Sequence, residues 1–130
     1  MKYTSLIKKA QSAKKYSYSP YSKFRVGAAL LTSSGKIYTG CNIENSSFSL
    51  TVCAERTAIF KAISEGSTKF KAMAICTDSS EIIPPCGACR QVMLDLTPNI
   101  DVILTNSKGK SLVMKANSLL PHPFTKKHLH

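Results

Sequence analysis

Two short cysteine motifs, far apart in the chain, constrain the fold more than any other feature of the sequence. The first is Cys53-Ala54-Glu55-Arg56, and the second, Pro84-Pro85-Cys86-Gly87-Ala88-Cys89, contains two cysteines one helical turn apart. Three cysteines are three candidate zinc ligands, and a catalytic zinc keeps its fourth position open for water or substrate. A chain that uses all three must fold so that both motifs meet at one ion.

The other cysteines also argue for metal binding and against disulfides. The chain has five cysteines, an odd number, and its first 15 residues lack the apolar core of a signal peptide. We therefore expect a cytoplasmic protein, in which disulfides are rare. We also expect no membrane association, because no apolar run approaches the ~18 residues of a spanning helix. Cys41 and Cys76 lie in apolar, strand-like runs, and we interpret both as small buried side chains.

Hydrophobic periodicity predicts a single α/β domain covering residues 1–130, a length sufficient for one packed core. We expect helices at 3–15, 54–66 and 86–96, and strands at 24–32, 37–42, 72–76, 102–104 and 112–114. The run 72–76 is apolar throughout, which is typical of a central strand covered on both faces. Strands that alternate with helices favour one sheet between helices, and hairpins at both ends make the sheet mixed. The tail from Asn117 is expected to fray at 126–130.

Cys-x-Glu followed by Pro-Cys-x-x-Cys resembles the signature of the zinc-dependent cytidine deaminases, specifically of the small members with three cysteine ligands. The resemblance extends from Phe24 through Phe124. It implies a three-layer α/β/α sandwich around a five-stranded mixed β-sheet, one Zn²⁺ per subunit held by Cys53, Cys86 and Cys89, and a homotetramer with shared active sites. The implied reaction is hydrolytic deamination of free cytidine and deoxycytidine to uridine and deoxyuridine, with release of ammonia, in pyrimidine salvage.

Glu55 and Arg56 take their expected roles from this reaction. Deamination requires attack of water on C4 of cytosine, a proton at N3 and a proton for the departing amine, and one carboxylate can carry the protons for all three steps. Glu55 is the candidate, and the alternative is a first-turn glutamate stabilised by the helix dipole. Arg56 is expected to donate hydrogen bonds to the ligand sulfurs, and the alternative is an arginine on a solvated helix face.

Two other kinds of cysteine site remain to be considered. Cys-x-x-Cys is also the motif of thioredoxin-like redox pairs, but that function would leave Cys53 and Glu55 unexplained. A structural zinc site would need a fourth ligand, and the late candidates are His122 and His128 in the tail.

The resemblance also nominates residues that bind the nucleoside. Asn42 and Glu44 match the Asn-x-Glu that binds ribose hydroxyls in the family, although alone they would be ordinary turn residues. Phe24 matches an aromatic contact to the pyrimidine, and its alternative is a core strand residue. The backbone N–H of Ala54 matches the donor to O2 of the base. Phe124 matches a residue that covers the site of a neighbouring subunit.

The chain departs from the family pattern at two places. Phe48 stands where relatives often carry a tyrosine, so a hydroxyl contact made there would be lost. Pro123 is an unusual neighbour for Phe124 and leaves the path of the tail open.

The net charge of +11 is the one feature that suggests a different function. Residues 1–25 carry seven basic side chains and no acidic one, a distribution that could attract nucleic acid. Most are lysines rather than the arginines that bind phosphate with two hydrogen bonds, so we interpret them as a solvated face and expect no nucleic-acid partner.

Three alternative functions follow from these features. One is deamination of the nucleoside antibiotic blasticidin S, against which the ribose-type pair Asn42 and Glu44 argues. Another is deamination of a polynucleotide, but such enzymes typically carry histidine where this chain has Cys53. The last is a basic zinc module that binds nucleic acid without catalysis, which would be expected to interleave aromatic residues with arginines.

Overall fold

The computed structural model describes residues 3–129, so Lys2 of the basic segment and His130 of the tail lie outside the described residues. The helices are α1 (Thr4–Lys14), α2 (Ala54–Ser64), α3 (Gly87–Leu96) and the short α4 (Ala116–Leu119), with 3₁₀ turns η1 (Phe48–Leu50) and η2 (Lys126–His128). The strands are β1 (Val26–Thr32), β2 (Ile37–Cys41), β3 (Phe70–Thr77), β4 (Asp101–Thr105) and β5 (Ser111–Lys115). No helix within 3–129 is both long and apolar enough to cross a membrane.

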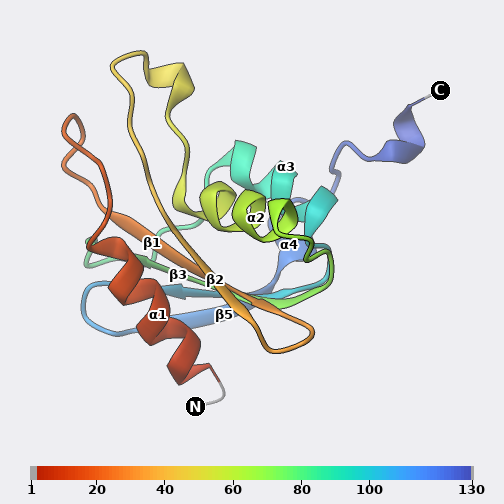
Figure 1. Ribbon diagram of the computed structural model, residues 1–130, viewed down its shortest axis with the longest axis horizontal. Helices are drawn as coiled ribbons and strands as arrows, with labels where there is room; N and C mark the ends of the chain where they lie inside the picture. The colour runs from red at the N-terminus through yellow and green to blue at the C-terminus, as the bar shows by residue number, and fades with distance from the viewer. Residues whose placement is uncertain (1–2, 130) are drawn as a thin grey trace.

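The five strands form one mixed sheet in the order β2-β1-β3-β4-β5, which Figure 1 shows from one side. Antiparallel hairpins β1-β2 and β4-β5 lie at its two edges, β1 pairs antiparallel with β3, and β3 pairs parallel with β4. The predicted central strand is confirmed: β3 lies in the middle of the sheet, and its residues from Ala72 to Thr77 are all buried.

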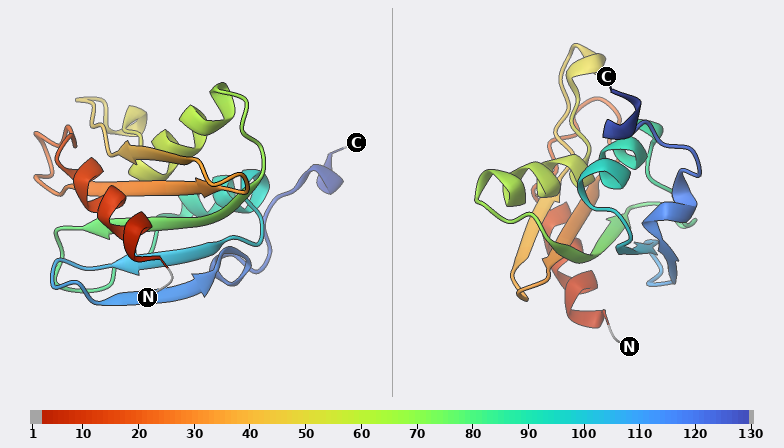
Figure 2. Two further views of the ribbon diagram at one scale, coloured as in Figure 1. Left: turned by 60° about the horizontal axis from the view of Figure 1, so that its bottom comes forward. Right: turned by 90° about the vertical axis from the view of Figure 1, so that its right-hand side faces the viewer.

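Helices cover both faces of the sheet, so the predicted three-layer sandwich is confirmed (Figure 2). On one face, Leu6 and Ala10 of α1 pack against a cluster that includes Ala29, Ala74 and Ile103. The other face carries α2 and α3, and the buried side chains there form the larger core cluster. Both clusters are apolar, and their burial is the main force that holds the layers together.

Helix α2 lies directly on the backbone of β2, and this contact fixes where the helix begins. A Cβ atom added at Gly40 would lie 2.6 Å from the carbonyl oxygen of Ala54 and 2.6 Å from the nitrogen of Ala58. Because any side chain at this position would collide with helix backbone, only glycine permits the approach. The first turn of α2 is thereby held beside the end of β2.

The structure differs from the sequence prediction in three places. The strand expected from residue 24 begins at Val26, because Lys23 has φ 60 and turns the chain away from the sheet before it. Cys76 is buried as predicted, but the prediction is wrong for Cys41, which is half-buried because it ends the edge strand β2. The tail contains the unpredicted helix α4 and then leaves the body of the molecule, as Figure 1 shows.

Candidate active site

The three cysteines of the two motifs meet at one place. Cys53 and Cys86 occupy the residues directly before α2 and α3, both in extended conformation, and Cys89 lies in the first turn of α3. Their sulfur atoms all lie within 4.8 Å of one another, with 3.7 Å between Cys53 and Cys86 and 3.4 Å between Cys86 and Cys89. Tetrahedral zinc with Zn–S bonds of ~2.3 Å would place its sulfurs ~3.8 Å apart. The donor set therefore fits Zn²⁺.

The electrostatics of the cluster also favour a cation. The thiol of Cys89, with help from Arg56, lowers the pKa of Cys53 to about 5, which favours its thiolate form. Contact with Cys53, together with burial, raises the pKa of Cys89. A divalent cation between the sulfurs would favour the thiolate form of each cysteine, which is why metal binding to thiols releases protons.

Arg56 lies beside the cluster, where the sequence predicted it. Its Nη2 donates to the carbonyl oxygen of Thr51 at 3.4 Å and to Sγ of Cys53 at 3.6 Å. A guanidinium in contact with a ligand sulfur offsets part of the negative charge that three thiolates bring to a zinc ion.

Glu55 is buried next to the cysteines, with only 4% of its surface exposed. Burial is the main cause that raises its pKa to about 7, and the charge of Cys53 adds to it, while its own backbone N–H opposes the shift. A carboxyl group with a pKa near neutrality can both accept and return a proton, which is the property of a general acid–base catalyst.

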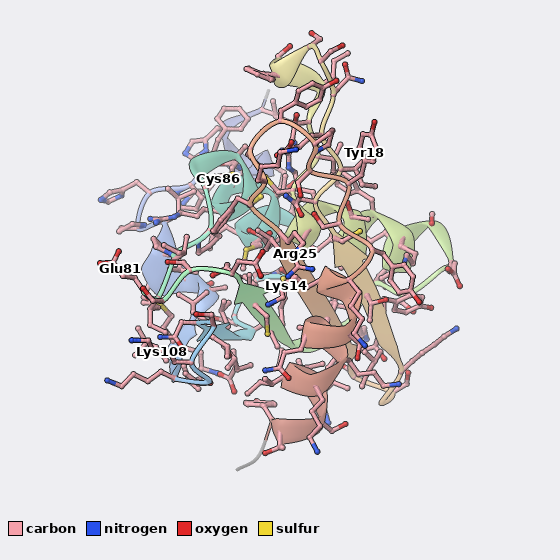
Figure 3. All side chains as sticks on the ribbon, turned by 90° about the vertical axis from the view of Figure 1, so that its left-hand side faces the viewer. Lys14, Tyr18, Arg25, Glu81, Cys86 and Lys108 are labelled. Atoms are coloured by element: carbon pink, nitrogen blue, oxygen red, sulfur yellow. The ribbon has the colours of Figure 1, made fainter. Side chains whose placement is uncertain are left out.

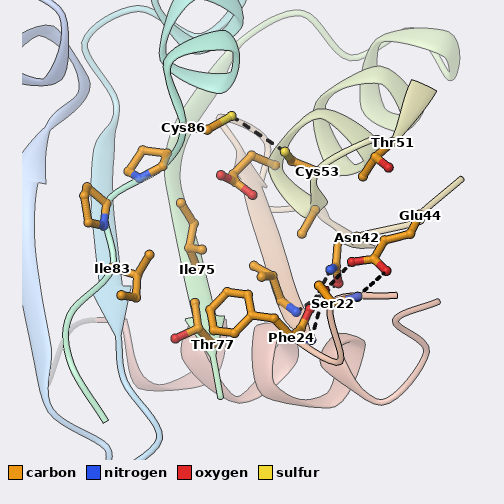
Figure 4. A pocket seen from close by; sticks show the side chains of 15 residues that line it. Ser22, Phe24, Asn42, Glu44, Thr51, Cys53, Ile75, Thr77, Ile83 and Cys86 are labelled. Carbon is orange, nitrogen blue, oxygen red and sulfur yellow. Dashed lines mark hydrogen bonds between the residues drawn. The ribbon is translucent and has the colours of Figure 1, made fainter. Parts of the chain in front are cut away.

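A pocket of about 260 Å³ opens in front of Glu55 (Figure 4). It lies at the end of the sheet where β2 and β3 stop and β1 begins, and it is mostly apolar inside. The lining residues are Ser22, Phe24, Val26, Asn42, Glu44, Thr51, Cys53, Ala54, Glu55, Ile75, Thr77, Ile83, Pro84, Pro85 and Cys86.

Asn42 faces this pocket but is largely occupied by the framework. Its Oδ1 accepts from the backbone N–H of Val26 at 2.9 Å and from the hydroxyl of Ser17 at 2.5 Å, and its Nδ2 donates to the carbonyl oxygen of Phe24 at 2.8 Å. An amide carries two donor hydrogens, so one of them has no acceptor among the described residues. Asn42 can therefore offer a ligand one donor, and it also holds Phe24 at the pocket.

Glu44 lies beside Asn42 at the pocket mouth. Its Oε1 accepts from the backbone N–H groups of Tyr21 at 3.0 Å and Ser22 at 3.1 Å, and its Oε2 accepts from the hydroxyl of Ser22. Hydrogen bonds from Ser22, that of its hydroxyl foremost, lower the pKa of Glu44 below its ordinary value. The carboxylate is thus oriented, and three of its roughly four lone-pair sites are occupied, which leaves one on Oε2 to accept from a ligand.

Not every predicted site residue lies here. Phe124 is 58% exposed in the tail and does not line the pocket of its own chain. Two hydrogen bonds hold the tail next to Pro123: the side chain of Gln91 donates to the Phe124 carbonyl at 2.6 Å and accepts from the Phe124 N–H at 3.0 Å. Phe48 is also exposed and lies against the edge of the Tyr21 ring.

Sequence reasoning missed several residues of the pocket, chiefly Ser22, Thr51 and Ile83. These are loop residues without a motif of their own, and only the proximity of Ser22 to Phe24 could have pointed to it. The alternative of a four-ligand zinc site gains no support, because neither His122 nor His128 belongs to the cysteine cluster. Nδ1 of His128 instead accepts from the N–H of Thr125 at 3.1 Å.

Comparison with known proteins places the chain in a family. Residues 1–105 match the family described as "Cytidine and deoxycytidylate deaminase zinc-binding region". The cytidine deaminase of Sporosarcina psychrophila is 50% identical over 95% of this chain and 92% of its own length. That of Halalkalibacterium halodurans is 50% identical over 92% of each chain.

A solved structure agrees with the sequence relatives. The crystal structure of cytidine deaminase from Burkholderia pseudomallei superposes with a TM-score of 0.92 and 47% identity, over 95% of this chain and all of the other. The resemblance predicted from the cysteine motifs is therefore confirmed. With a cysteine cluster that fits zinc, the matching fold and relatives of this identity, the chain belongs to the zinc-binding cytidine and deoxycytidylate deaminase family.

Proposed function

We propose that this protein is a zinc-dependent enzyme that deaminates free cytidine and deoxycytidine to uridine and deoxyuridine, with release of ammonia. The observation that carries the proposal is the position of Glu55, a buried carboxyl group that interacts with Cys53 and Cys89 of the cysteine cluster and lines a pocket. Relatives with half of their residues identical to this chain are named cytidine deaminases, which supports the same substrate class.

Cys53, Cys86 and Cys89 would hold Zn²⁺, which would supply Lewis-acid activation of the water that attacks C4 of the cytosine ring. Glu55 accepts one proton from that water and delivers it to N3 of the ring. It then accepts the second proton, from the hydroxyl now on C4, and delivers it to the amine, which leaves as ammonia when the C4–N bond breaks. The starts of α2 and α3, which point at the cluster, bring partial positive charge that offsets the thiolates, and Arg56 adds to it.

The nucleoside is bound and oriented from two sides of the pocket. The N–H of Ala54, at the start of α2, donates to O2 of the base, and Phe24 on the opposite side packs against the pyrimidine. Asn42 has one amide hydrogen to donate and Glu44 has one lone-pair site left to accept, which suits a pair of sugar hydroxyls. Both residues lie in the pocket that contains Glu55.

Assembly and context form part of the proposal. We infer that the chain is a single domain that forms a homotetramer, in which Phe124 covers the site of a neighbouring subunit. The exposure of Phe124 and the hold of Gln91 on its backbone support this role. We also infer a cytoplasmic enzyme of pyrimidine salvage that uses neither nucleic acid nor a membrane.

The test is to incubate the zinc-analysed protein with cytidine, with deoxycytidine and with a cytosine-bearing oligonucleotide, and to follow the loss of cytosine absorbance. We expect rapid conversion of the nucleosides and none of the oligonucleotide. Glu55→Gln should retain zinc and fold while kcat falls by about 10²–10⁴-fold. Glu65→Gln, at the exposed far end of the same helix, is the matched control and should leave kcat unchanged.

Other outcomes would contradict the proposal in distinct ways. Conversion of the oligonucleotide alone would make the basic face the substrate platform and would refute the roles of Asn42 and Glu44. Turnover of cytidine by Glu55→Gln at the parent rate would refute the proton-carrier role. Zinc binding with no turnover of either substrate would lead to blasticidin S as the next substrate to test.

A further inference from the structure

Ser22 connects two side chains on the nucleoside side of the pocket. Its backbone N–H donates to Oε1 of Glu44 at 3.1 Å, and its hydroxyl donates to Oε2 of the same carboxylate. The oxygen of that hydroxyl also accepts from the backbone N–H of Phe24 at 3.0 Å. Figure 4 shows Ser22 between Glu44 and Phe24 at the edge of the pocket.

We propose that Ser22 is a positioning residue for nucleoside binding, which holds the sugar-recognising carboxylate of Glu44 in one orientation and ties it to Phe24. The inference rests on the proposed function and adds a residue to which neither the sequence motifs nor the mechanism assigns a role.

The hydrogen bonds of Ser22 indicate that it positions Glu44 and does more than stabilise a local turn. A serine in an ordinary turn bonds backbone groups two or three residues away, whereas this hydroxyl reaches a carboxylate 22 positions along the chain. Because Ser22 contacts both oxygens of Glu44, the carboxylate cannot rotate without breaking one of the bonds. A side chain that must be immobilised on binding loses conformational entropy, and a carboxylate held beforehand avoids that loss.

The backbone between the two contacts supports the same arrangement. Lys23 adopts φ 60, a left-handed conformation that is uncommon for a side-chain-bearing residue. This conformation lets the N–H of Phe24 return to the hydroxyl of Ser22 instead of continuing the extended chain. Hydrogen bonds from Ser22 also lower the pKa of Glu44, which keeps the carboxylate in its accepting form.

The test compares Ser22→Ala with the parent on two substrates, cytidine and 2′,3′-dideoxycytidine. For cytidine we expect KM to rise about tenfold, the usual effect of one hydrogen bond to a charged group, with kcat within about twofold of the parent. The dideoxy substrate lacks the 2′- and 3′-hydroxyls, which are the ones we expect Glu44 to bind, and keeps only the 5′-hydroxyl. Its kcat/KM should therefore fall no more than about threefold, through the contact to Phe24 alone.

Two further variants separate positioning from folding. Ser22→Thr keeps the hydroxyl on an exposed residue and should restore KM. Ser118→Ala removes another exposed serine hydroxyl, which donates to the carbonyl of Lys115 outside the pocket, and should change neither constant. Thermal unfolding of all variants should show that Ser22→Ala remains folded at the assay temperature.

Several results would overturn the inference. These are an unchanged KM in Ser22→Ala, an equal loss on both substrates, or a fall in kcat at constant KM. In each of these cases the unmodified protein would still convert cytidine, so only the role of Ser22 would be refuted and the proposed function would stand. A parent that does not convert cytidine would instead remove the proposed function and this inference together.

Discussion

The two sides of the pocket are held in place by different parts of the fold. The metal half, formed by Cys53, Glu55, Cys86 and Cys89, sits on the first residues of two helices that pack on the sheet. The nucleoside half, formed by Phe24, Asn42 and Glu44, lies on connecting segments outside regular structure.

Different interactions stabilise the two halves. Helix starts on a packed core are rigid because burial of apolar surface fixes them. The nucleoside half depends on side-chain hydrogen bonds between segments 17–26 and 42–44, made by Ser17, Ser22, Asn42 and Glu44. On the proposed function, the chemistry is thus built on the core and substrate recognition on loop contacts, so we expect changes in the nucleoside half to leave the metal half undisturbed.

The largest expected effect tests the metal half alone. Cys86→Ala removes one of the three proposed ligands from an exposed position, so the fold should be retained while zinc is lost. Loss of groups that only support a metal ligand already costs ~10–100-fold, so turnover should fall by more than about 100-fold. Zinc content and cytidine turnover are the measurements.

Cys41→Ser is the control for this prediction, because Cys41 is half-buried and stands outside the cluster. It should keep zinc and activity. A Cys86→Ala protein with full zinc content would show that the three sulfurs are not the ligand set.

The next effect tests how the core positions the metal half. Gly40→Ala forces a Cβ into helix backbone 2.6 Å away, so α2 must shift together with Cys53 and Glu55 at its start. Overpacking of this kind typically costs 1–3 kcal/mol, and a clash with rigid backbone should be at the upper end, about 3 kcal/mol of unfolding free energy. Chemical denaturation measures this loss, and turnover should fall with it.

Gly35→Ala is the comparison for the clash. A Cβ at Gly35 meets nothing within 4 Å, but its φ of +97 is unfavourable for alanine, so we expect a smaller loss of about 1 kcal/mol. Equal losses in the two variants would mean that the contact between β2 and α2 does not position the site.

The difference between the halves also explains how much could be predicted from sequence. Zinc ligands and Glu55 stand in short motifs whose spacing fixes their placement relative to a helix start, so the metal half could be predicted from local residues. The central strand could be predicted because Ala72–Cys76 is apolar throughout and is buried on both faces.

The nucleoside half could be predicted only in part. Asn42 and Glu44 were nominated by resemblance, but their bonds to Ser17 and Ser22 join segments that only the folded chain brings together. The burial of Cys41 was predicted wrongly because the order of strands, which places β2 at an edge, is a property of the whole sheet. Helix α4 was missed because a four-residue helix has too short a periodic pattern to detect.

Asn42→Ala should separate the two halves. It removes three hydrogen bonds from a buried side chain and leaves the N–H of Val26 and the carbonyl of Phe24 without this partner, so we expect a loss of about 2–3 kcal/mol. KM for cytidine should rise while zinc content stays at the parent value.

Asn117→Ala is the control, because it breaks only exposed hydrogen bonds to Asn99, and it should cost less than about 0.5 kcal/mol of unfolding free energy. Loss of zinc in Asn42→Ala would show that the halves are not independent.

The smallest effect concerns the ion cluster of Lys14, Arg25 and Asp78, in which Arg25 is the residue after Phe24. Asp78 accepts from Nε of Arg25 at 2.9 Å and lies 3.1 Å from Nζ of Lys14, the two basic residues that Figure 3 shows next to each other. Hydrogen bonds from Arg25 foremost, and from Lys14, lower the pKa of Asp78 below its ordinary value. A carboxyl group with a lowered folded-state pKa stabilises the protein fully above its ordinary pKa of ~3.9, and this stabilisation is lost as the pH falls through the lowered value.

Asp78→Asn should therefore cost stability near neutral pH and little in strong acid. With Asp78 29% and Arg25 49% exposed, water and salt screen the pair, so we expect about 1 kcal/mol or less at pH 7. The difference in unfolding free energy between parent and variant should stay constant down to about pH 4 and shrink below it. Asp95 on α3 makes no ion pair within residues 3–129, so Asp95→Asn is the control and should change the unfolding free energy by less than about 0.5 kcal/mol. Arg25 directly follows Phe24, so the ion cluster could also position Phe24. A rise in KM for cytidine in Asp78→Asn, together with the loss of stability, would show that the cluster contributes to nucleoside binding. An unchanged KM would show that it does not.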